Sequence, residues 1–151
     1  MAKIALASDH GGFALKEAVK AHLLSRGEEV EDFGTYDTSS CDYPDYGIAA
    51  AKAVADSTCD KGILVCTTGI GISMAANKVP GIRCALLSET TSARLTREHN
   101  DANVMALGGG FTGPLLACEI VDVFLDTPFS GEEKHSRRIA KVMALDERWD
   151  G

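Results

Sequence analysis

The chain has 151 residues, of which 45% are hydrophobic and 25% charged, and its formal net charge at pH 7 is −7. This length fits one domain spanning 1–151, and the negative charge argues against nucleic acid or an anionic membrane surface as a partner. No apolar run approaches the roughly 20 residues of a membrane span, and the N-terminus lacks the apolar stretch of a signal peptide, so we expect a soluble cytoplasmic domain.

Segments typical of strands and of helices alternate along the chain. Short apolar runs bounded by turn residues predict buried strands, and apolar residues at helical spacing predict the helices between them. In chain order, the predicted elements are a strand over Lys3–Ala7, a helix over Phe13–Arg26, a strand over Glu28–Phe33, a helix from Pro44 to about Asp56, a strand over Gly62–Cys66, a helix over Ile72–Asn77, a strand over Ile82–Leu87, a helix over Glu89–His99 with Ser88 as its N-cap, a strand over Val104–Leu107, a helix from Pro114 to about Leu125 and a C-terminal helix over 132–148.

This alternation, with strands that are continuous apolar runs, is typical of a parallel sheet with helices on both faces. We therefore predict an α/β fold, a single Rossmann-like three-layer domain with a five-stranded parallel sheet. The C-terminal helix has no strand to return to, and we expect it to pack on a second subunit in a homodimer. Ligands of such sheets bind outside the carboxyl ends of the strands, where Asp9, His10, the Cys66–Gly71 turn and the Gly108–Gly110 turn should meet.

The turn after the third strand is the most informative segment. The strand ends at Cys66, the residues Thr67–Gly71 turn sharply, and a helix begins. Backbone N–H groups and the positive end of the helix dipole would bind an anion there, and they would favour a Cys66 thiolate that acts as base or nucleophile. The alternative is that Cys66 is a small hydrophobic residue at the end of a buried strand. The five cysteines are odd in number and lack a CxxC pair, which predicts free thiols and neither a disulfide nor a zinc site.

Three familiar anion-binding templates do not fit this turn, and neither does a response-regulator receiver, whose acidic pocket Asp9 would match. Met74 stands where a dinucleotide fingerprint needs its third glycine, and the chain contains no GxxxxGK[ST] segment. Ile72 stands where a phosphatase loop would carry an arginine. Cys66 stands where a response-regulator receiver would carry an aspartate.

Other polar residues are candidates for chemistry. Asp9 and His10 end the first strand, where a carboxylate beside an imidazole favours a functional role. His99 ends a helix, where interaction with the helix dipole is a sufficient explanation by itself. His135 lies in the basic cluster Lys134–Arg138, which is either a solvated helix face or a phosphate clamp.

Four blocks of sequence can be compared with known families. They are SDHGG at Ser8–Gly12, DYPDYG at Asp42–Gly47, CTTGIGISMAANKVPGIR at Cys66–Arg83 and REHNDANV at Arg97–Val104. In this order they resemble ribose-5-phosphate isomerase type B, a family that also includes the subunits of galactose-6-phosphate isomerase. The resemblance covers nearly the whole chain.

The resemblance implies a cofactor-free and metal-free aldose–ketose isomerase that interconverts D-ribose 5-phosphate and D-ribulose 5-phosphate through a cis-enediolate. It also implies a homodimer with shared active sites, or a tetramer. Cys66 matches the family's base, Thr68 a hydroxyl that assists transfer between the two oxygens, and His99 the group that opens the furanose ring. The matching substrate-binding positions are the backbone of Thr67, Gly69, Ile70 and Gly71 around the enediolate oxygen, Asp9 and Asn100 near the sugar hydroxyls, and His10, Lys134 and Arg138 around the phosphate, with Gly110 at the turn after the fifth strand.

Two positions depart from the family's pattern. Gly110, within GGGFTG, and Lys134 stand where ribose-type members commonly carry arginine, and lysine lacks the bidentate fork of arginine. The GGGFTG turn is closer to the galactose-6-phosphate isomerase subunits, whereas Glu98–Asp101 keeps an EHND block that those subunits lack. The alternatives are the same chemistry on a six-carbon phosphate such as allose or galactose 6-phosphate, the same chemistry on a free aldose, and a non-catalytic sugar-phosphate-binding domain.

Overall fold

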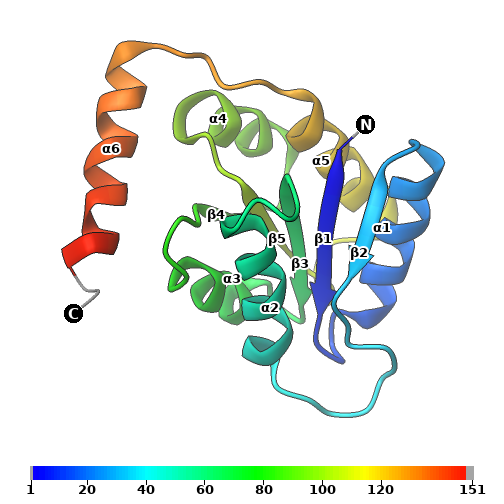
Figure 1. Ribbon diagram of the computed structural model, residues 1–151. Helices are drawn as coiled ribbons and strands as arrows, with labels where there is room; N and C mark the ends of the chain where they lie inside the picture. The colour runs from blue at the N-terminus through cyan, green and yellow to red at the C-terminus, as the bar shows by residue number, and fades with distance from the viewer. Residues whose placement is uncertain (1, 149–151) are drawn as a thin grey trace.

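The computed structural model describes residues 2–148, in which five strands form one sheet in the order β2-β1-β3-β5-β4 (Figure 1). All neighbouring strands are parallel, so their carboxyl ends lie at one edge of the sheet. The predicted five-stranded parallel sheet is confirmed. The strands are β1 Lys3–Ser8, β2 Glu29–Asp32, β3 Lys61–Cys66, β4 Cys84–Leu86 and β5 Val104–Gly108.

Helices cover both faces of this sheet, as predicted. α1, α4 and α5 pack on one face and α2 and α3 on the other, while α6 stands beside the body of the molecule (Figure 1). The helices are α1 Phe13–Ser25, α2 Tyr43–Ala55, α3 Ile70–Asn77, α4 Thr90–Asn100, α5 Pro114–Asp126 and α6 Glu133–Arg148.

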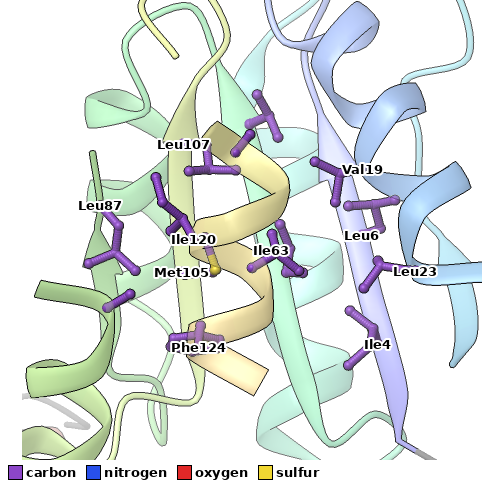
Figure 2. Close-up of a cluster of buried hydrophobic side chains, with 14 of the residues drawn as sticks. Ile4, Leu6, Val19, Leu23, Ile63, Leu87, Met105, Leu107, Ile120 and Phe124 are labelled. Carbon is purple, nitrogen blue, oxygen red and sulfur yellow. The ribbon is translucent and has the colours of Figure 1, made fainter. Parts of the chain in front are cut away.

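Buried apolar side chains form one layer on each face of the sheet. Successive side chains of a strand point to opposite faces, so Ile63 and Val65 pack against α1 and α5 whereas Leu64 and Cys66 pack on the side of α2 and α3. Cys66 therefore lies at the end of its strand on the face where α3 begins. The layer against α1 and α5, which Figure 2 shows, includes Ile4, Leu6, Val19, Leu23, Ile63, Met105, Leu107, Ile120 and Phe124.

The predicted N-cap of α4 is wrong by one residue. The cap is Glu89, not Ser88, and its carboxylate accepts the N–H of Thr91 over 2.6 Å and the N–H of Ser92 over 2.8 Å. A carboxylate satisfies two of the helix's first N–H groups and complements the positive end of its dipole, which a hydroxyl does less well.

β4 is shorter than predicted. It covers Cys84–Leu86 of the predicted Ile82–Leu87. The Arg83 carbonyl oxygen still accepts the Val104 N–H of β5 over 3.3 Å, but the Arg83 N–H bonds to a side chain. The Arg83 N–H donates to Oδ1 of Asn103 over 2.9 Å. β4 is also the edge strand beside β5, so one of its sides has no neighbouring strand in the sheet.

The predicted C-terminal helix is present and begins one residue later, at Glu133. Its first turns contact α4, and the helix then runs alongside the body of the molecule (Figure 1), where Asp146 near its end accepts the Gly81 N–H over 2.8 Å. Within residues 2–148, no helix has both the length and the apolar character needed to cross a membrane.

Candidate active site

The carboxyl ends of β1 and β3 are where this sheet is expected to bind a ligand. The chain passes from β1 to β2 on one side and returns to β3 on the other, so its connections diverge between these two strands. Divergence of this kind opens a crevice outside the strand ends. Asp9 and His10 directly follow β1, and Cys66 ends β3. Three of the predicted site residues therefore lie at this crevice.

The turn after β3 directs a backbone N–H at the sulfur of Cys66. The Gly69 N–H donates to Sγ over 3.1 Å, and Cys66 is only 4% exposed. Gly69 has a φ of +76°, which lets α3 begin at Ile70, two residues earlier than predicted. A Cβ on Gly69 would lie 2.8 Å from the carbonyl carbon of Leu107, so only glycine fits without movement of the backbone. The Cys66 sulfur therefore accepts a backbone N–H at the N-terminal end of α3.

The backbone N–H groups of Thr67–Gly71, which were predicted to bind an anion, are only partly free to do so. Gly69 donates to Cys66, and the Ile70 N–H donates to Oγ1 of Thr68 over 3.1 Å. Two of the amides are thus engaged by side chains of the turn itself, because backbone donors take up the nearest acceptor. A substrate oxygen would replace these acceptors or use the other amides at the start of α3.

Hydrogen bonds fix the residues that follow β1. Asp9 is buried, and its Oδ1 accepts the Gly12 N–H over 3.0 Å. His10 is exposed, and its Nδ1 accepts the Cys41 N–H over 3.2 Å. A nitrogen that accepts carries no proton, so neutral His10 presents its N–H at Nε2. The crevice therefore offers a carboxylate and an imidazole donor beside the thiol turn.

The turn after β5 closes against the turn after β3. The Gly109 N–H donates to the carbonyl oxygen of Cys66 over 2.8 Å, and the Gly110 N–H donates to that of Thr67 over 2.9 Å. A Cβ on Gly110 would lie 3.1 Å from the Thr67 oxygen, so this close approach favours glycine. Gly110 belongs to the same crevice, as predicted.

His99 and Asn100 lie at the opposite edge of the sheet. α4 runs back from the carboxyl edge and ends at Asn100, shortly before β5 begins at Val104. Val104 pairs with Gly62, four residues before Cys66 on β3, and four residues of strand span about 13 Å. Within one chain, His99 is therefore separated from Cys66 by the length of the strand.

A groove of about 740 Å³ between α4 and α6 contains this second group. Its walls include His99, Asn100 and Arg138, and Lys134 is exposed close by, with its Nζ 3.6 Å from the Glu132 carboxylate. The predicted residues thus form two groups and not one. Asp9, His10, the 66–71 turn and Gly110 lie at the carboxyl edge, and His99, Asn100, Lys134 and Arg138 lie at the amino edge.

Two further residues lie at these sites: Tyr43, which was not among the predicted ones, and His135, which was a candidate only as part of the basic cluster. A Cβ on Gly71 would lie 2.6 Å from Cζ of Tyr43, so this tyrosine ring covers the start of α3. Its position in the DYPDYG block was the available signal. His135 is 7% exposed and stacks on His99, so the solvated-face interpretation is wrong for this residue. No periodicity in the sequence indicates that partner.

The thiols of Cys59 and Cys84 lie in surroundings that differ from those of Cys66. Burial and the neighbouring Glu31 raise the pKa of Cys59 to about 11, and burial raises the pKa of Cys84 to about 12. Both thiols remain protonated near neutral pH. Among the residues that the structure describes, no group of three or more histidine, cysteine, aspartate or glutamate side chains is arranged to hold a metal ion.

A doubly wound parallel sheet with a thiol, a carboxylate and an imidazole at its switch point defines a Rossmann-like domain equipped for acid–base chemistry on a small anionic ligand. Comparison with known families gives a more specific assignment. The model of the Ribose/Galactose Isomerase family matches residues 4–142, and the chain belongs to this family. The resemblance carried by the four sequence blocks is confirmed.

Individual relatives agree with this assignment over nearly their full lengths. Ribose-5-phosphate isomerase B of Escherichia coli K12 is 47% identical over 148 residues, which are 98% of this chain and 99% of that protein. The solved structure of Clostridium thermocellum ribose-5-phosphate isomerase B has a TM-score of 0.96 at 48% identity and covers 98% of this chain and 99% of its own. The galactose-6-phosphate isomerase subunit LacB of Clostridium acetobutylicum is 40% identical over 98% of this chain and 86% of its own.

Proposed function

We propose that this protein is an isomerase that interconverts D-ribose 5-phosphate and D-ribulose 5-phosphate. The observation that carries the proposal is the Cys66 thiol, which receives the Gly69 N–H at the start of α3 beside Asp9 and His10. Proton transfer next to a carbonyl requires a base with a stabilised charge and donors near the developing oxyanion. The relative named ribose-5-phosphate isomerase B, at 47% identity, supports this substrate.

The first chemical step opens the furanose ring, and His99 performs it. The O1 hydroxyl gives up its proton, the C1–O4 bond breaks, C1=O1 forms and O4 receives a proton. An imidazole titrates near neutral pH, so His99 can take the first proton and supply the second. No proton is gained or lost overall.

The second step moves a proton from C2 to C1. The Cys66 thiolate takes the C2 proton, and the electrons of that C–H bond form the C1=C2 bond of a cis-enediolate while charge develops on O1. The proton returns to C1, a proton passes from O2 to O1, and C2=O2 forms. The Thr68 hydroxyl assists this second transfer because it can both donate and accept. The positive end of α3 and amides of Thr67–Gly71 stabilise the charge on O1.

The other residues hold the sugar phosphate in place. Asp9 and Asn100 bind sugar hydroxyls, and the phosphate is bound by the Nε2–H of His10 together with Lys134 and Arg138. Charge-assisted hydrogen bonds of this kind are the strong ones for phosphate. Local cations allow an anionic substrate to bind although the whole chain carries a net charge of −7.

We also propose that each active site takes residues from two chains of a homodimer. The support is the separation of Cys66 and His99 at opposite edges of the sheet, which one five-carbon substrate cannot bridge within a single chain. A two-fold axis perpendicular to the strands reverses their direction, so it brings the His99 edge of one chain against the Cys66 edge of the other. Two identical sites result.

The β4 edge of the sheet is a suitable contact surface for this dimer. Near this edge strand, Ile70, Met74 and Leu86 are 47%, 64% and 45% exposed. Exposed apolar side chains beside an edge strand are typical of a surface that a partner covers. Association of two such dimers would give a tetramer with the same two-chain sites.

The second candidate substrate is a six-carbon sugar phosphate such as allose or galactose 6-phosphate. Gly110 favours it, because a turn without a bulky cation leaves room at the phosphate end of the crevice. The 40%-identical relative named as a galactose-6-phosphate isomerase subunit supports the same possibility.

The test is a comparison of kcat/KM for ribose 5-phosphate, allose 6-phosphate and galactose 6-phosphate in buffer containing EDTA. A preference for ribose 5-phosphate is expected, and a preference for a six-carbon substrate would contradict the assignment. Tight binding of these sugars without turnover would show a binding domain and not an enzyme.

A further inference from the structure

His135 is buried although the helix that carries it is not. It is 7% exposed and is the one buried residue of α6 between Glu133 and Glu147. Its neighbours Lys134 and Ser136 are exposed. The contact that covers this ring is with His99.

The two imidazole rings are stacked face to face. Their centroids are 4.3 Å apart and their planes differ by 15°. The backbone ties the segment before α6 to the same turn of α4, because the Ser130 N–H donates to the carbonyl oxygen of Glu98 over 3.3 Å. The His135 N–H in turn donates to the carbonyl oxygen of Glu132 over 3.1 Å. His135 is therefore held on His99 by the connection and by its own helix.

The stack limits where a proton can reside. Burial lowers the pKa of His135, His99 across the stack lowers it further, and Lys134 and Arg138 act in the same direction against the opposing charge of Glu132. Of these groups, His99 lies on α4, Lys134 and Arg138 lie on α6, and Glu132 directly precedes α6. Two protonated rings in contact would repel each other. Near neutral pH His135 is thus a neutral ring packed on His99.

We propose that His135 is a positioning residue for the opening of the furanose ring. This inference rests on the proposed function of His99. A neutral ring packed on one face of the His99 imidazole fixes the plane in which its nitrogens reach the groove between α4 and α6. Misplacement of a proton donor by about 1 Å costs on the order of 100-fold in rate.

Two measurements separate ring opening from proton transfer at carbon. Conversion of ribose 5-phosphate requires ring opening, because this sugar is a furanose. Ribulose 5-phosphate is open-chain, because its C5 oxygen carries the phosphate, so exchange of a C1 proton with D₂O requires only the Cys66 step. Proton NMR in D₂O follows both reactions in the wild type, H135A and H135F, with H99N as the reference and thermal unfolding as the check on folding.

We expect H135A to lower the conversion of ribose 5-phosphate by about 10- to 100-fold and to leave C1 exchange within about threefold of the wild type. H135F keeps a ring on His99 and should restore conversion to within about threefold. Equal losses of both reactions in H135A would show a merely structural role, and no loss of either would show no role; both results overturn the inference. A wild type that converts no ribose 5-phosphate would instead overturn the proposed function, so the two failures are distinguishable.

Discussion

Cys66 differs from the other thiols in what surrounds its sulfur. It receives the Gly69 N–H over 3.1 Å at the start of α3, whereas burial alone raises the pKa of Cys84 to about 12. Cys66 ends β3 and Cys84 begins β4 of the same sheet, and in the sequence both resemble small apolar residues of a strand. The chemistry of a thiol therefore depends on the turn beside it and not on the strand that carries it.

Replacing this thiol tests its role as base. C66A should lower the conversion of ribose 5-phosphate by about 100- to 10,000-fold, because the residue that moves the proton is lost. It should lower the rate of C1 exchange in ribulose 5-phosphate by the same factor. C84A is the matched control and should retain activity within a few-fold. Full turnover by C66A would show that the base is another group.

Among the elements, the turn between β3 and α3 was the most predictable part of the site. Its glycines and the strand before it indicated a sharp turn, and the close approach of Gly69 to Leu107 explains why glycine is needed. The boundaries were less predictable, because they depend on hydrogen bonds between side chain and backbone. The Glu89 cap of α4 is such a case, and so is the engagement of the Ile70 N–H by Thr68.

A pair of glycine substitutions tests the turn. Gly69 and Gly27 both have positive φ, but a Cβ on Gly27 would have nothing within 4 Å, whereas one on Gly69 would meet the Leu107 backbone. G27A should lower the free energy of unfolding by about 1–2 kcal/mol, the cost of left-handed backbone. G69A should lower it by a further 1–3 kcal/mol or so, the usual cost of overpacking. Chemical denaturation measures both, and equal losses would contradict this description of the turn.

The docking of α6 should depend on pH through His135. Its pKa is lowered in the folded protein from an ordinary value near 6.5, chiefly by burial, so the undocked helix binds a proton at higher pH than the docked one does. Docking should therefore weaken as the pH falls below about 6.5. Hydrogen exchange of the amides in the first turn of α6, corrected for intrinsic rates, should show less protection at acidic pH in the wild type. H135F cannot titrate and should show no such change, and a wild type with constant protection would refute this prediction.

Across the whole molecule, the alternation of strands and helices was predictable largely because β1, β3 and β5 are short continuous apolar runs, whereas β2 is a partly buried EVED segment. The same patterns gave no indication that the site residues divide between two edges of the sheet. α4 begins at the carboxyl edge and ends at the amino edge, so His99 in its last turn lies away from Cys66 in the same chain. The family resemblance indicates which residues meet around the substrate but not which chain supplies them. The stacking of His135 on His99 joins segments that are distant in sequence, and no local pattern encodes it.

If the active site is shared, Cys66 of one chain and His99 of another act on the same substrate molecule. Two heterodimers test this arrangement by their conversion of ribose 5-phosphate. In each heterodimer the two chains carry different tags, and purification through both tags removes the homodimers. The first pairs C66A with H99N and would hold one intact site out of two, so it should have about half of the wild-type activity. The second pairs the wild type with the double variant C66A/H99N and should be inactive. An inactive first heterodimer together with a half-active second would contradict the shared site, because it would show that each chain holds a complete site of its own.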